Sequence, residues 1–86
     1  MNVSNGSDLN TINKVGFYSI NNPVNAPSEI LDWWVDMIVL NTGGTDTYVM
    51  QMLIPHVKNI KPDIYIRVST NSTWDGWYKF SATSVE

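Results

Sequence analysis

Apolar side chains occupy alternate positions through most of the chain, and glycine, proline and asparagine interrupt this alternation at intervals of about 8 to 15 residues. A period of two is typical of strands, because successive side chains of a strand point to opposite faces of a sheet. The pattern predicts a mostly β domain, a small antiparallel meander with one short helical turn near the N-terminus. The predicted strands are Gly16–Ile20, Trp33–Leu40, Tyr48–Ile54 (ended by Pro55), Asp63–Ser69 and Trp77–Ala82.

Two of these segments also carry information about burial. Both sets of alternate positions in Trp33–Leu40 are largely apolar, which predicts a central strand covered on both faces. In Asp63–Ser69 the aliphatic residues are expected to point inward, whereas Tyr65 and Arg67 point outward. The inward residues are Ile64, Ile66 and Val68.

Turn-forming residues separate the predicted strands. Asn21–Ser28 holds two prolines and three asparagines, a composition that favours loop over strand. Adjacent glycines in Asn41–Thr47 can supply the positive φ that a tight hairpin needs. The helical turn is predicted within residues 7–14, because Ser7 or Asp8 can cap it and apolar residues then follow at helical spacing.

Composition narrows the class of protein. The 86 residues suit one domain with a modest core, expected over residues 1–86 and cut from a longer chain. The chain has no cysteine, so it has neither disulfides nor thiolate metal ligands. A net charge of -3 with scattered basic residues argues against nucleic-acid binding, and the longest apolar run is too short for membrane insertion.

The polar residues form no recognisable catalytic or metal-binding pattern. A single His56 has no second histidine or cysteine beside it, so a structural role is favoured over a metal site. Asp32 and Asp36 would share a strand face, but a small meander has little room for the cleft of a carboxylate-pair glycosidase. Gly43-Gly44 lacks the spacing of a phosphate loop. We expect no enzyme and no cofactor.

Aromatic residues are abundant for so small a domain. The tryptophans are Trp33, Trp34, Trp74 and Trp77. Flat rings beside Asn, Asp and Arg suit saccharide binding, because the C–H faces of a sugar stack on rings and its hydroxyls pair with polar groups. The alternative is that the rings form the core, since each large ring buries about 150 to 250 Å². For any single tryptophan we favour a position in the core. Whether at least one of the four is an exposed ligand contact is left open by the sequence.

Several segments, taken in order, resemble a known family. They are Asp8-Leu-Asn-Thr-Ile-Asn-Lys-Val-Gly-Phe-Tyr18, Asn25-Ala-Pro27, Tyr48-Val-Met-Gln51, Ile64-Tyr-Ile-Arg67 and Trp74-Asp-Gly-Trp77. From Asp8 to Phe80 the chain is similar to the pyocin-knob domain of phage tail fibres and R-type bacteriocin fibres. The resemblance implies a non-catalytic β knob of a homotrimeric fibre, a virion component made in the bacterial cytoplasm that acts outside the cell in host attachment.

The same resemblance suggests roles for the tryptophan pair. Arg67 is expected to lie over one indole as a cation–π pair, with Trp77 covering the end of the sheet and Trp74 exposed in a tight turn beside Asp75. The expected ligand is a bacterial surface polysaccharide. Its predicted contacts are Trp74 with Asp75, Trp33 with Asp32, and Arg67.

Two other functions fit the same residues. A purely structural knob would space or trimerise the fibre through an apolar patch and would have no affinity for sugars. A saccharide-binding module appended to a cell-wall hydrolase would keep that affinity but would be a monomer.

Overall fold

Nine short elements form the chain in the computed structural model, which describes residues 2–30, 34–41, 48–56 and 63–86. Seven are strands and two are single 3-10 turns, so the predicted mostly β class is confirmed for the described residues. In chain order they are β1 (Asn2–Asn5), η1 (Leu9–Thr11), β2 (Gly16–Asn21), η2 (Ser28–Ile30), β3 (Trp34–Asn41), β4 (Tyr48–His56), β5 (Ile64–Thr70), β6 (Thr73–Trp74) and β7 (Tyr78–Phe80).

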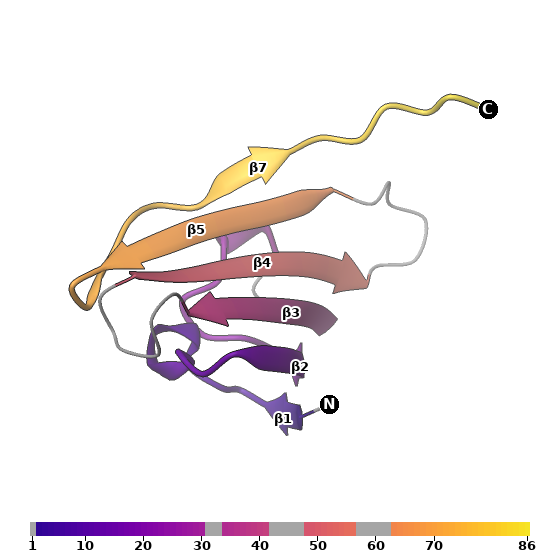
Figure 1. Ribbon diagram of the computed structural model, residues 1–86. Helices are drawn as coiled ribbons and strands as arrows, with labels where there is room; N and C mark the ends of the chain where they lie inside the picture. Colours follow the sequence, from indigo (N-terminus) through magenta and orange to yellow (C-terminus); the bar gives the residue numbers. More distant parts are fainter. Residues whose placement is uncertain (1, 31–33, 42–47, 57–62) are drawn as a thin grey trace.

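The strands build one sheet in the order β1-β2-β3-β4-β5, and β6 and β7 both pair with the outer edge of β5. Figure 1 shows these strands side by side, with the two ends of the chain at opposite edges of the sheet. The β1–β2 pairing is parallel. All other strand pairs are antiparallel, as expected for the predicted meander. β1 was not predicted, because Asn-Val-Ser-Asn offers too few apolar positions to show an alternation.

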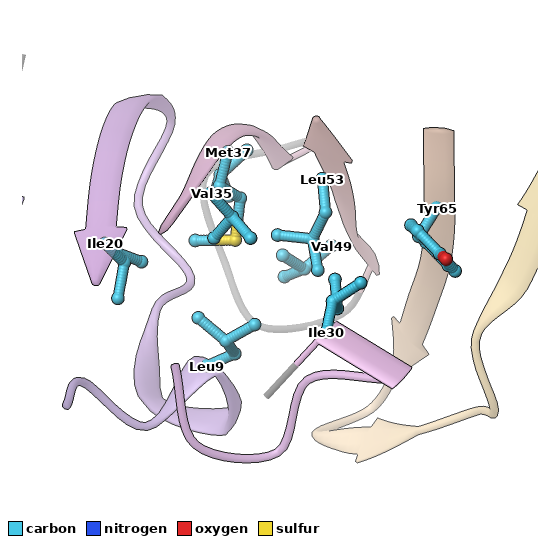
Figure 2. Close-up of a cluster of buried hydrophobic side chains, with 9 residues drawn as sticks. Leu9, Ile20, Ile30, Val35, Met37, Val49, Leu53 and Tyr65 are labelled. Carbon is cyan, nitrogen blue, oxygen red and sulfur yellow. The ribbon is translucent and has the colours of Figure 1, made fainter. Parts of the chain in front are cut away.

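One face of the sheet carries the core. Strand residues meet Leu9 from η1 and Ile30 from η2, and both of these side chains are completely buried. Figure 2 shows Leu9 and Ile30 reaching toward the strand side chains from segments below the sheet. The buried strand residues are Ile20, Val35, Met37, Val39, Val49, Leu53 and Tyr65. Asp8 caps η1 by accepting a hydrogen bond from the backbone of Asn10, which confirms the predicted helical turn and its cap.

The opposite face of the sheet is apolar too, and we call it the open face. Its apolar side chains are all half-buried or exposed. They are Phe17, Trp34, Ile38, Leu40, Tyr48, Met50, Met52, Ile54, Ile64, Ile66, Val68, Tyr78 and Phe80. Strand register aligns one row of five of them straight across the sheet, namely Phe17, Ile38, Met52, Ile66 and Tyr78.

Two predictions about burial are therefore wrong. β3 is central, but only the face that carries Val35 and Met37 is covered, whereas Trp34 stays 40% exposed. β5 is turned the other way from its prediction, because Tyr65 and Arg67 lie on the covered face with only 5% exposure each. The aliphatic residues of β5 (Ile64, Ile66, Val68) face outward. The covered face accepts Arg67 because it supplies a hydrogen-bonding partner for the guanidinium.

The predicted strand ends shift for physical reasons. β4 continues through Pro55 to His56 instead of stopping at the proline. Its pairing with β5 ends at Leu53, so Pro55 lies where only β3 is a neighbour and a missing N–H is tolerated. The last predicted strand shortens to β7, and the two-residue β6 was not predicted.

Some predictions fall outside the described residues. These concern Asp32, Trp33, residues 42–47 of the predicted hairpin turn, and residues 57–62. Among the residues that are described, no helix has the length and apolar character needed to cross a membrane.

Candidate functional site

The Trp-Asp-Gly-Trp segment lies along the edge of β5 as a broken strand. Trp74 pairs with Ser69, and Tyr78 pairs with Ile66. The edge segment therefore advances by four residues over a length in which β5 advances by three. The extra residue is a bulge between β6 and β7, and the backbone N–H of Asp75 bonds the carbonyl of Val68 within it. In a regular strand two residues three apart would face opposite sides. The bulge instead places both tryptophans on the covered face.

Arg67 lies between the two indoles. Its guanidinium carbon is 4.1 Å from the ring centre of Trp74 and 4.4 Å from that of Trp77. The Nε–H donates to Oε1 of Gln51 at 2.9 Å, and Gln51 is itself fully buried. Burial lowers the pKa of Arg67 to about 10, and the carboxylate of Asp8 partly opposes this effect. The stacked rings and Gln51 thus stabilise a cation inside the core.

Both tryptophans are tied to the loops that cover the sheet. The Nε1–H of Trp74 donates to the carbonyl of Asn10, and that of Trp77 donates to the carbonyl of Asn25, each at 3.1 Å. Both rings are half-buried and pack against the core. The expected contact between Arg67 and an indole is confirmed and involves both rings. The expected exposure of Trp74 is wrong, because the bulge places it on the covered face, where it is half-buried like Trp77.

A hollow of about 190 Å³ lies beside the outer part of Trp74. Its other lining residues are Asn10, Asn13, Val49, Ser69 and Ser72. One aromatic wall with amide and hydroxyl groups around it can accept a small polar ligand. Of the predicted contact residues, Trp74 lines the hollow, Arg67 is buried beneath the indoles, and Asp75 is exposed in the bulge. Asp32 and Trp33 lie outside the described residues.

A second polar cluster joins η2 to the far edge of the sheet. The phenol of Tyr65 donates a hydrogen bond to Glu29, and burial together with this contact raises the pKa of Tyr65 to about 12. The Tyr65 hydrogen bond, and next that of Lys79, lower the pKa of Glu29. Lys79 lies 3.0 Å from Glu29 and 3.5 Å from Asp63. These contacts hold η2 against β5 and β7, so we assign them a structural role.

His56 is placed at the rim of the open face. Its Nε2 lies 2.5 Å from Oδ2 of Asp36 on the neighbouring strand, which agrees with the structural role favoured from sequence. Within the described parts of the chain, no cluster of three or more His, Cys, Asp or Glu residues could hold a metal ion.

The open face is the largest surface feature that sequence reasoning missed. Six of the nine exposed large hydrophobic side chains among the described residues lie on it, including Phe17 at 60% and Tyr78 at 68% exposure. Its rim is polar, with His56 at one end, Thr70 at the other and Asn21 at the side, and His56 hydrogen-bonds Asp36, which lies one row further in. The signal was present in the apolar residues at both sets of alternate positions. That pattern was interpreted as burial on two sides.

The sequence was compared with known protein families. The sequence fits the family model of the XkdV N-terminal domain over residues 2–80, which is nearly the whole chain. That family is phage-related and comprises tail proteins, so the expected phage tail protein is confirmed, although the family matched is not the pyocin knob. No curated protein and no solved structure matches the chain.

Proposed function

Because the chain belongs to the XkdV N-terminal domain family of phage tail proteins, we propose that it is a non-enzymatic assembly module of a phage tail. The open face is the observation that carries this proposal. Its partner is a flat, apolar and uncharged protein surface within the virion, and the contact holds the tail together.

The chemistry of the open face supports such a partner. Its acidic side chain, Asp36, lies between Ser19 and Ile54 and shares a hydrogen bond with His56, whereas the central row from Phe17 to Tyr78 carries no charged side chain. An apolar centre with a polar rim is the usual anatomy of a protein–protein interface. Its five strands hold 3 to 9 residues each, and at about 3.4 Å per residue and about 4.8 Å between strands they give a plane of roughly 500 Å². Apolar patches of about 300 to 600 Å² are the largest found on ordinary monomers and often mark binding sites.

A charge placed at the centre of the open face tests the assembly role. The substitution Met52→Lys would be introduced into the tail protein within the phage or prophage that encodes it. A lysine there is tolerated by a monomer, because Met52 is only half-buried, but it opposes burial against an apolar partner. We expect intact tails to become rare in electron micrographs.

The matched control is Thr11→Lys, an exposed position on the turn that covers the other face. It should leave tail assembly unchanged. Circular dichroism of both purified variants should show the wild-type strand content. Normal tails in the Met52→Lys phage would overturn the assembly role of this face.

A second candidate function is saccharide contact during host attachment, favoured by the hollow beside Trp74. Its walls combine one indole with the polar side chains of Asn10, Ser69 and Ser72, which is the mixture that sugar rings and hydroxyls require. A bacterial surface polysaccharide is the proposed ligand, and the hollow would hold one small unit of it.

The hollow can be tested without disturbing the tryptophans. The chain would be titrated with purified bacterial cell-wall and capsular polysaccharides while tryptophan fluorescence is recorded. A saturable shift that is lost in Ser72→Ala, an exposed residue, would support the candidate. A flat response across the panel would remove it and leave the assembly role unaffected.

A further inference from the structure

We infer that the open face binds the open face of a second copy of this chain, about a twofold axis that passes near Met52. This inference rests on the proposed assembly function and names the partner. The two sheets would pack face to face as a β-sandwich formed by two chains.

The distribution of exposed apolar groups selects a twofold contact. The three exposed large hydrophobic residues that lie off the open face are Val15, Val24 and Val85, and each stands alone in the described part of the chain. A ring or a head-to-tail chain needs two different complementary patches on every subunit, whereas a twofold pair needs one self-complementary patch. The described surface offers one such patch. A pair therefore fits this surface better than a trimer built from the same face.

Charged side chains are few on the open face. The chain carries a net charge of -3, and two copies repel each other least across a surface that holds few of these charges. Among the strand residues of the open face, Asp36 is the one acidic side chain, and it shares a hydrogen bond with His56.

The shape of the face suits sheet-on-sheet packing. Antiparallel sheets stack about 10 Å apart with their strands within about 30° of each other, and the side chains of the two inner faces interdigitate. A standard stable interface buries about 800 Å² per partner. The plane of roughly 500 Å² is smaller than this area, and the thirteen apolar side chains that project from it add further accessible surface.

Met52 marks the centre of the proposed contact. β4 is the third of the five strands that form the open face, in the order β2, β3, β4, β5 and β7. Met52 is the middle one of the β4 residues that face this side, and it pairs with Ile38 and Ile66. Methionine adapts its shape to its neighbours, which suits a residue that must pack against its own copy.

Mass measurement of the 86-residue chain tests the inference. Light scattering after size exclusion, over concentrations from micromolar to several hundred micromolar, should give twice the 9.7 kDa mass of the chain. Met52→Lys should halve the measured mass while keeping the wild-type circular dichroism spectrum. Thr11→Lys, on the opposite side, should remain a pair.

Methionine oxidation gives an independent readout on the same chain. Hydrogen peroxide should oxidise Met50 and Met52 more slowly as the protein concentration rises, because pairing buries them. Met37 is buried in the core at any concentration and serves as the internal control. Mass spectrometry would follow each site.

The outcomes separate this inference from the assembly role. A monomer at every concentration, a trimer, or oxidation rates that do not depend on concentration would overturn the twofold pair. The phage carrying Met52→Lys would still decide the assembly role by itself. Lost tails together with a monomeric chain would mean that a different tail protein covers the open face.

Discussion

Arg67 is the residue where local pattern and tertiary environment disagree most. A charged side chain between two aliphatic neighbours is normally expected at the surface. Here the guanidinium is buried between two indoles, and its Nε–H bonds Gln51. Stacking on both sides and one side-chain acceptor make this burial tolerable, since an isolated buried charge would cost several kcal/mol.

Equal losses of stability are expected when either indole is removed. Trp74→Ala and Trp77→Ala should each lower the free energy of unfolding by about 2 to 4 kcal/mol, because each removes packing, a hydrogen bond and one face of the Arg67 stack. Urea titration followed by circular dichroism measures both, with the exposed Val15→Ala as a control. A loss confined to Trp77→Ala would restore the unequal roles predicted from the sequence.

Asp8 should make stability depend on acid pH. Hydrogen bonds from the side chain of Asn25 and the backbone of Asn10 lower the pKa of Asp8 below its usual value of 3.8. The unfolded chain therefore binds the proton first as pH falls, so the contribution of Asp8 is complete above about pH 4 and is lost below it. The gap in melting temperature between wild type and Asp8→Asn should shrink on acidification from pH 7 to 2.5. A gap that stays constant would contradict this account.

At the scale of elements, η1 is held to the sheet by a polar contact within an apolar core. Gln51 of β4 donates from Nε2 to the carbonyls of Leu9 at 2.7 Å and Ile12 at 2.8 Å. Its Oε1 accepts from Arg67, so one amide joins the covering turn, the central strand and β5. A 3-10 turn of three residues has little stability of its own and depends on such contacts.

Gln51→Leu should therefore destabilise the domain although leucine is apolar and similar in size. The substitution removes the Gln51 hydrogen bonds to the carbonyl of Ile12 and to the Nε–H of Arg67, and one of the two hydrogen bonds to the carbonyl of Leu9, which should cost about 2 to 4 kcal/mol. Chemical denaturation measures the cost, and hydrogen exchange at Ile12 would report loosening of η1. The neighbouring Met50→Leu, on the open face, is the control and should change little. Wild-type stability of Gln51→Leu would show that the amide contacts contribute nothing.

At the scale of the whole molecule, one sheet has one covered face and one open face. A sheet that is apolar on both faces must bury both to form a stable assembly, and the described segments cover only one. The described residues leave the open face without a cover, so it is available to another molecule. The second copy inferred above is one such molecule.

Pairing through the open face should not weaken as salt is added. Its central row carries no charged side chain, and salt screens the repulsion between two chains of net charge -3, so the dissociation constant of the pair should rise by less than about threefold between 50 and 500 mM sodium chloride. Sedimentation equilibrium at both salt concentrations measures it. A tenfold or greater weakening at high salt, which is typical of ionic contacts, would assign the association to a charged surface instead of the open face.

The sequence by itself determined the class of fold, the position of most strands and a capped helical turn within residues 7–14, and the family resemblance suggested the contact of Arg67 with an indole. These features depend on local alternation, on turn-forming residues and on motifs close together in the chain. Tertiary structure decided which face of β3 and β5 is covered, because both sets of alternate positions are apolar and the cover comes from Leu9 and Ile30. Tertiary structure also produced the bulge that brings both tryptophans onto Arg67. One inserted residue reverses which side chains of a strand point to which face, and the composition of the segment does not reveal it.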